Sequence, residues 1–302
     1  MYLAEFSALA AALCWSFGGL LSTTPTRAFG AVAFNRLRLT IVAAILGVAV
    51  LLTGGWRTLD GHSLGVLVIS AVIGIFIGDT LLYASLKRIG PRRMGVLFTT
   101  NAPMTVILGY LCLDETLPLN SATGCLLIMI GVVLAVTCGR RGEGQHSFEK
   151  VQGSLATGIG LGFLSALCQA VSVLIARPIM ASGVDAVAAS ALRVATAALL
   201  LNLLFLLRLA PGEGQRQAVT GRLLALTAMS GTVGMALGMT FILFALAHGP
   251  AGLVSTLSAT SPILILPILW VATGQRPRPG AWVGAMLTVL GVACIFSPWA
   301  SS

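Results

Sequence analysis

The stretch GIFIGDTLLYASLKRIGPRRMGVLFTTNAP, which runs from Gly74 to Pro103, decides how the rest of the chain is interpreted. It holds an acidic residue, Asp79, well inside an apolar run, and two glycines, Gly74 and Gly78, at a spacing typical of close helix contacts. In the second half of the chain the glycines and prolines return as Gly234, Gly238, Gly249-Pro250 and Pro262, with Met239 in place of Asp79. The pattern therefore predicts an internal duplication in which only one copy carries the charge.

The composition indicates an all-α membrane protein. Hydrophobic residues make up 57% and charged residues 9% of the 302 residues, and the mean hydropathy is +0.98. A soluble domain carries about 25% charged residues. The apolar runs are continuous rather than alternating, which excludes a transmembrane barrel. Ten runs are long enough to cross a bilayer as helices, at about 3–22, 30–52, 64–86, 94–113, 121–138, 154–176, 184–207, 221–247, 251–271 and 280–297.

The ten predicted helices divide into two repeats of five, residues 1–138 and 154–302, joined by a charged, glycine-rich linker at 139–153. Five is an odd number, so the second repeat must enter the membrane upside down relative to the first. Inverted repeats of this kind are a transporter architecture, with binding sites near the membrane midplane where the repeats meet.

The basic residues predict an orientation in the membrane rather than a nucleic-acid surface. Thirteen of the 18 Lys and Arg residues lie in or at the edge of the odd-numbered connections, and two lie in the even-numbered ones. Because cytoplasmic loops carry the excess of Lys and Arg, both termini are expected outside the cytoplasm. None of the six cysteines has CxxC spacing, so we expect no metal and no cofactor.

Two matched segments carry a family resemblance. GPRRMGVLFTTNAPMTVILGYLCLDETL in the first half corresponds to GPAGLVSTLSATSPILILPILWVATGQRP in the second. Together with the ten predicted spans, this pattern resembles the EamA family of the drug/metabolite transporter superfamily. The resemblance implies a secondary transporter of small metabolites such as amino acids, often an exporter, in a bacterial inner membrane. The chain departs from the family in two respects. Glu115 has Gln275 (or Gly274) as its second-half counterpart, and family members usually have cytoplasmic termini.

Polar residues at membrane depth are the candidate binding or coupling residues, because a charge there is costly and is normally kept for function or paired. The set is Asp79, Tyr83, Trp15, Arg36, Asn101, Thr99, Gln169, Arg193 and Ser258, with Pro103 and Pro262 as hinges that free backbone carbonyls. Arg36 is the expected inward-facing arginine because Arg193 occupies a similar place in the second half.

Each candidate has a structural alternative. Asp79 could form a fixed ion pair with Arg36 or Arg38, and Tyr83 could serve only to hold that carboxylate. Arg36 could anchor loop carbonyls, and the hydroxyls near the prolines could bond to their own helices. Trp15 could be a core residue.

The favoured function is export of a small metabolite such as an amino acid, with proton coupling at Asp79. One alternative is multidrug or organic-cation efflux with Asp79 as the cation partner. An alternative of another class is a membrane-embedded enzyme or assembly factor, which the lack of any phosphate-loop, HExxH or GxSxG motif disfavours. The expected partners are a small-molecule substrate and the lipid bilayer, with no nucleic acid; a homodimer stays open.

The loop charges make the first testable prediction. A reporter that fluoresces only in the cytoplasm should stay dark when fused after Ser302. Neutralising Lys87, Arg88, Arg92 and Arg93 together should weaken the orientation, because these residues form the largest basic group in the odd-numbered connections. A bright fusion at Ser302 in the unaltered protein would show that the orientation is reversed.

Overall fold

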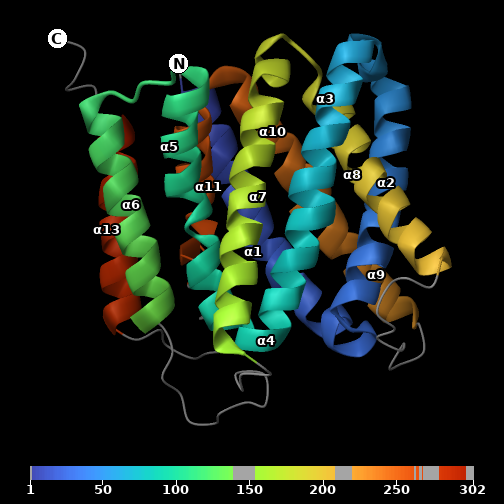
Figure 1. Ribbon diagram of the computed structural model, residues 1–302, viewed down its shortest axis with the longest axis horizontal. Helices are drawn as coiled ribbons and strands as arrows, with labels where there is room; N and C mark the ends of the chain where they lie inside the picture. The colour runs from blue at the N-terminus through green and yellow to red at the C-terminus, as the bar shows by residue number, and fades with distance from the viewer. Residues whose placement is uncertain are drawn as a thin grey trace.

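The first half of the chain forms a series of helices in the computed structural model, which describes residues 2–138, 154–207, 220–261, 263–264, 267 and 279–296 (Figure 1). The helices of this half are α1 (Leu3–Phe29), α2 (Ala31–Thr53), α3 (Gly61–Ala71), α4 (Asp79–Phe98), α5 (Asn101–Leu113) and α6 (Leu119–Cys138). A 3-10 turn, η1 (Gly55–Thr58), follows α2, and a π-helical segment, η2 (Val72–Gly78), joins α3 to α4.

The second half repeats this order. Its helices are α7 (Leu155–Ala181), α8 (Ala186–Leu206), α9 (Gly221–Ser230), α10 (Gly238–His248), α11 (Ala251–Ser258) and α13 (Pro279–Phe296), and the π-helical segment η4 (Gly231–Leu237) joins α9 to α10. No strand occurs in the part of the chain that the structure describes. The predicted linker, 139–153, lies outside the described residues.

The protein is an integral membrane protein. Six helical stretches are long and apolar enough to cross a bilayer: Leu3–Ser22, Val32–Thr53, Gly61–Leu82, Leu155–Ala181, Ala186–Leu206 and Gly221–His248. Three shorter apolar helices accompany them, Asn101–Leu113, Leu119–Leu134 and Pro279–Ile295. The ninth predicted span, 251–271, is described only in part, so the count of ten spans stays a prediction.

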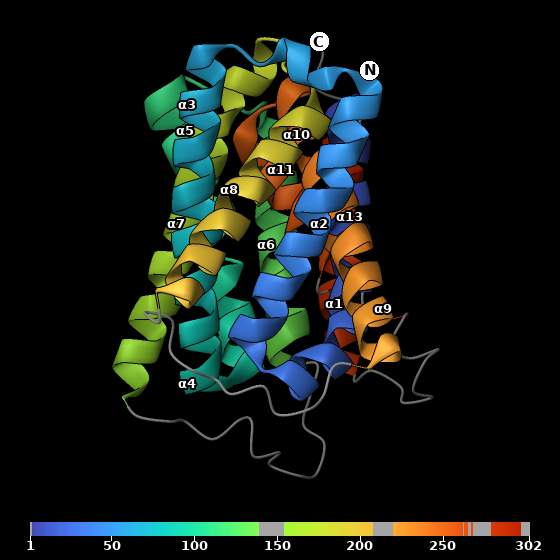
Figure 2. The same cartoon turned by 90° about the vertical axis from the view of Figure 1, so that its right-hand side faces the viewer.

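The two halves run in opposite directions. Helix α1 begins and α13 ends at one end of the bundle, whereas α7 begins at the other (Figures 1 and 2). We call the end where α1 begins the terminus end. The first helix of each half packs against the other half. α1 lies against α9, η4, α10 and α11, and α7 lies against α3, η2, α4 and α5. α2 packs on α8, and α6 packs on α13. The interface between the halves therefore runs through the middle of the bundle.

Both halves contain a π-helical segment at the corresponding place, directly before Asp79 in the first half and Gly238 in the second. A π turn widens the helix and redirects backbone carbonyls, and such turns are frequent at functional sites. In the first half two of these carbonyls have partners on α7. Gly74 O accepts from Gln169 Nε2 at 3.1 Å, and Gly78 O accepts from Ser165 Oγ at 2.8 Å.

The break between α4 and α5 lies at Thr99-Thr100 and not at Pro103. Pro103 is the third residue of α5, in a first turn where a missing N–H leaves no helical bond unmade. The prediction that Pro103 frees the carbonyl of Thr99 is wrong, because that oxygen accepts a hydrogen bond from Ala102 N at 3.3 Å.

In the second half the carbonyl of Ser258 accepts a hydrogen bond from Ser261 Oγ at 2.8 Å. The Ser258 hydroxyl bonds to a carbonyl of its own helix, and the hydroxyls of Thr100 and Thr260 bond to carbonyls of the helices that they follow, α4 and α11. This agrees with the structural alternative for the hydroxyls near the prolines. Pro262 lies outside the described residues.

The basic segment expected to form a turn, residues 87–93, is helical in the structure. α4 continues through it to Phe98, and the Arg88 guanidinium donates to Ala84 O at 3.1 Å. Basic side chains at a membrane interface do not require an open turn, and a helix keeps its backbone groups bonded.

Helices α6 and α13 pack through glycines. A Cβ added at Gly131 would lie 2.6 Å from Gly284 O and would strike the Thr288 hydroxyl, and one added at Gly124 would lie 2.6 Å from Gly291 O. The repeated glycines of these two helices therefore permit backbone contact between the last helices of the two halves.

The replacement Gly131→Ala should destabilise the protein by about 1–3 kcal/mol, because the added methyl meets backbone that cannot move aside. Thermal unfolding in detergent would measure this. Gly47→Ala on α2 is the matched control: nothing lies within 4 Å of its Cβ position, so it should be neutral or slightly stabilising. Equal melting temperatures for the two variants would contradict the tight α6–α13 contact.

Candidate functional site

Asp79 is the first residue of α4, immediately after the π-helical segment η2, and its side chain is half-buried. Two guanidinium groups act on its carboxylate electrostatically, those of Arg38 on α2 and Arg193 on α8. Gln169 on α7 donates from Nε2 toward Asp79 Oδ1 at 3.5 Å, at the outer limit of a hydrogen bond. The carboxylate therefore lies where helices of both halves meet.

Arg193 is buried, with only 3% of its surface exposed. Its Nη2 donates to Ser172 Oγ on α7 at 2.7 Å, and its Nη1 lies 3.5 Å from the sulfur of Met239 on α10. Its Nε has no hydrogen-bond partner among the residues that the structure describes. A guanidinium carries five N–H donors, so this group keeps unused donor capacity inside the bundle.

Ser172 is itself held by the first half. Its hydroxyl donates to Ser70 O at 2.8 Å, and the Ser70 hydroxyl donates to Ser172 O at 2.7 Å. A Cβ at Gly74 would overlap the Ser172 side chain, so only glycine leaves room for this contact. The glycine of η2 thus allows α7 to come close enough for Ser172 to orient Arg193.

Arg38, and not Arg36, is the arginine of α2 that acts on Asp79. Both Arg38 and Arg193 are the eighth residue of their helices, counted from Ala31 and Ala186. Arg38 Nη2 donates to Asn35 Oδ1 at 2.8 Å, and within the described part of the chain its Nε has no hydrogen-bond partner. The expectation that Arg36 faces inward is wrong. Two residues apart on a helix means roughly 200° around its axis, and the Arg36 guanidinium lies 3.4 Å from the centre of the Phe205 ring on α8.

The second half repeats the contact with different side chains. Trp15 on α1 corresponds to Gln169 and packs on Gly238, whose Cβ would lie 2.6 Å from the indole Nε1. Gly18 corresponds to Ser172. It touches Gly234, and its carbonyl accepts from Ser230 Oγ at 2.8 Å. The two contacts share their backbone geometry. Where the first contact has the polar side chains of Gln169 and Ser172, the second has the indole of Trp15 and Gly18.

The remaining predicted residues are placed as follows. Thr99 lies in the α4–α5 break and Asn101 directly after it, and both are half-buried, whereas Ser258 at the end of α11 is buried. The side chain of Tyr83 lies outside the described residues. The structure brings Asp79, Gln169 and Arg193 together, and Trp15 reaches the same interface through Gly238.

Sequence reasoning did not find Ser172, Ser70 or the role of Met239. These residues matter because each contacts a glycine or Arg193 of a distant helix. Such a contact cannot be recognised from the residue type alone. A cavity of about 600 Å³ lies elsewhere, between α5 and α6; most of its lining residues are apolar, among them Pro103, Ile107 and Leu126, and Glu115 also lines it. Because it does not include Asp79, we do not assign it as the site.

Removing the Ser172 hydroxyl should cost more stability than removing an ordinary buried hydroxyl. Ser172→Ala takes an acceptor from a buried guanidinium, and hydrogen bonds to charged groups contribute about 1.5–3 kcal/mol. Ser85→Ala is the matched control, since its buried hydroxyl donates only to Gly158 O at 2.8 Å, and such neutral bonds in membranes average about 0.6 kcal/mol. Thermal unfolding in detergent would compare the two, and equal losses would show that Ser172 does not hold Arg193.

Comparison with known proteins places this architecture in a family. The model of the EamA-like transporter family matches residues 2–137 and 156–297. A curated protein of Archaeoglobus fulgidus described as an uncharacterized transporter is 29% identical over 137 residues, which cover 45% of this chain and 49% of that protein. The match thus spans about half the length of that relative. A solved structure titled "Crystal structure of protein" is similar in fold, with a TM-score of 0.78, 22% identity and coverage of 97% of this chain and 96% of the other. The family match covers both halves of the chain, and the protein is a member of the EamA-like transporter family.

Proposed function

We propose that this protein is a secondary transporter that exports a small zwitterionic metabolite such as an amino acid, bound between the two halves beside Asp79. The observation that carries the proposal is the position of Asp79: Gln169 of the other half donates toward its carboxylate at 3.5 Å, and one arginine from each half, Arg38 and Arg193, lies within electrostatic range of it. A carrier must bind its substrate where both halves contact it, and inverted-repeat transporters do so near the midplane.

The charge of the site favours a zwitterion over an organic cation. One carboxylate and two guanidinium groups give the group a net positive charge. A purely cationic drug would add a like charge, whereas a substrate carboxylate would bind to donors that are already present, including the unpaired Nε of Arg193 and of Arg38. Organic-cation efflux is therefore the second candidate.

The two contacts across the interface also differ in polarity, which suits an amphipathic substrate. Gln169 and Ser172 accompany Asp79 on one contact, and Trp15 and Met239 occupy the other. An amino acid with an apolar side chain would place its charged groups near the first contact and its side chain near the second.

Asp79 is the proposed coupling residue, because its counterpart in the other half is Met239, which cannot titrate. As the halves rock, the distance of this carboxylate from the two arginines would change, and with it the affinity for a proton. The proposed location is a bacterial inner membrane, with the terminus end facing outward according to the positions of Lys and Arg.

The variant Asp79→Asn tests this proposal in proteoliposomes. Radiolabelled amino acids, supplied one at a time, should accumulate under a proton gradient in vesicles that contain the unaltered protein. In the variant accumulation should fall by more than about tenfold, because the amide cannot take up or release a proton. Exchange at equal pH should be partly kept, since the amide is nearly isosteric.

Asp60→Asn is the control for this experiment. Asp60 caps α3 outside the apolar span, where its hydrogen bonds with Ser63 hold its pKa below the usual value, and asparagine caps helices equally well. Full gradient-driven accumulation by Asp79→Asn would contradict coupling at Asp79. The absence of flux of any amino acid, with flux of organic cations instead, would favour the second candidate.

A further inference from the structure

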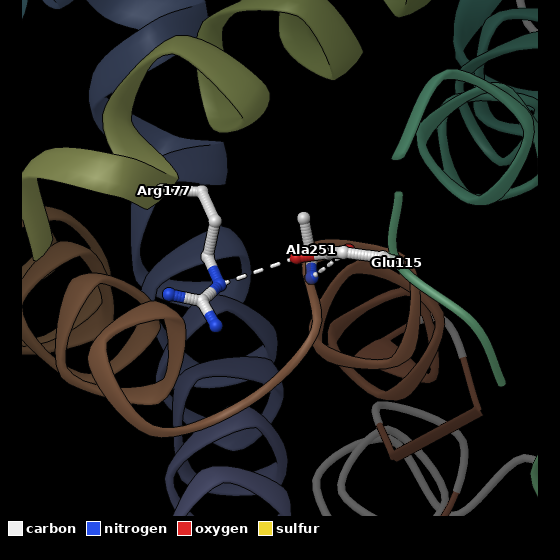
Figure 3. Close-up of polar contacts among 3 residues, drawn as sticks. All are labelled: Glu115, Arg177 and Ala251. Atoms are coloured by element: carbon white, nitrogen blue, oxygen red, sulfur yellow. Dashed lines mark hydrogen bonds and ion pairs between the residues drawn. The ribbon is translucent and has the colours of Figure 1, made fainter. Parts of the chain in front are cut away.

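A charged contact ties three helices together at the terminus end, away from Asp79. Glu115 follows α5, and its two carboxylate oxygens have different partners (Figure 3). Oε1 lies 3.3 Å from Arg177 Nε on α7, and Oε2 accepts a hydrogen bond from the backbone N–H of Ala251, the first residue of α11, at 2.7 Å. The side chains of Glu115 and Arg177 are exposed by only 13% and 21%.

The local backbone holds Glu115 in place. α5 ends at Leu113. The next residue, Asp114, has a left-handed backbone conformation, and Glu115 N donates back to Gly109 O at 3.2 Å. A Cβ at Gly109 would lie 3.0 Å from Glu115 Oε2, so this glycine leaves room for the carboxylate to fold over the end of its own helix. The carboxylate is thus directed toward α7 and α11.

Ala251 offers a donor that the helix itself cannot use. The first N–H groups of a helix have no intrahelical acceptor, and a negative charge there is favourable because of the helix dipole. The preceding residue, Pro250, has no N–H to compete. The Arg177 contact is an ion pair without a hydrogen bond at Nε, so the Ala251 contact supplies the directional part of the interaction.

These partners pack against different groups of helices. α7 packs on α3 and α4, α11 packs on α1 and α10, and α5 lies between them and packs on both α7 and α11. α5 and α11 also meet directly, where a Cβ at Gly252 would lie 2.8 Å from Val106 Cγ2. Glu115 therefore bridges the seam between the two groups at the terminus end.

We infer that the Glu115–Arg177–Ala251 contact is a latch that keeps the terminus end of the transporter closed and that breaks when this end opens. Opening along the α5–α11 seam would pull Ala251 away from Glu115, which stays with α5 and Arg177. The latch stabilises one of two alternating states and therefore sets their populations. The sequence gives it no acidic twin, since the counterpart of Glu115 is Gln275 (or Gly274), which lies outside the described residues. The inference rests on alternating access, which is part of the proposed function.

Native cysteines can report the opening in the full chain. Cys168 is half-buried beside Gln169, and Cys112, near the end of α5, is exposed. A membrane-impermeant maleimide would be added to sealed vesicles of each orientation, and the labelling of each cysteine would be measured by mass spectrometry. Cys112 serves as the reference for reagent access.

In Glu115→Gln and in Arg177→Gln, labelling of Cys168 from the terminus side should rise about tenfold relative to Cys112, because each change removes the ion pair from the closed state only. Arg177→Lys, which keeps the charge, should behave like the unaltered protein. Asp114→Asn is the matched control: it removes a carboxylate from the adjacent, exposed position and should leave labelling unchanged.

The outcomes separate the latch from a static contact and from the proposed function. If both glutamine variants melt earlier but leave Cys168 labelling unchanged, Glu115 only fastens the fold and the latch is wrong. The same holds if Asp114→Asn raises labelling equally. A rise confined to the Glu115 and Arg177 variants supports the latch even if no amino-acid flux is found, in which case the proposed substrate fails and the latch stands.

Discussion

The cost of holding charge inside an apolar helix bundle is the constraint on which this structure depends. Asp79 and Arg193 lie at the depth of membrane-spanning helices, where a charge is costly, so each needs partners from other helices. Those partners come from both halves of the chain: Ser172 and Gln169 on α7, Arg38 on α2 and Met239 on α10. Satisfying these charges therefore requires the two halves to pack through one another. The same packing places the polar groups at the interface, where a carrier needs them.

Glycine makes this arrangement possible in both halves. At Gly74 the absence of a side chain admits Ser172, and at Gly234 it admits the backbone of Gly18. The π-helical segments around these glycines turn carbonyls away from their own helix, and in the first half the side chains of α7 bind them. A backbone that is irregular at membrane depth is tolerated only where such partners exist. The π-helical backbone and the polar site thus depend on the same close packing of α7 against η2.

The sequence alone was sufficient for the class of protein and the opposed directions of the two halves, because apolar runs and internal repetition do not depend on tertiary detail. It failed at Arg36 and Pro103. At Arg36 the matching of the two halves was out by two residues, which on a helix turns a side chain to nearly the opposite face. At Pro103 the missing N–H fell within a first turn, where it breaks nothing. Ser172 could not be found because its importance depends on a glycine about a hundred residues away along the chain.

The backbone contacts of the two halves and the polar residues of the site are subject to different physical constraints. Backbone contacts repeat between halves: Gly18 meets Gly234 as Ser172 meets Gly74, and Trp15 meets Gly238 as Gln169 meets the end of η2. Rocking between two states needs this repetition, since each half must be able to take up the packing of the other. Binding and coupling have no such need, because a substrate has a single set of polar groups. Symmetric glycines with asymmetric polar residues therefore fit the carrier of a small polar metabolite that we propose.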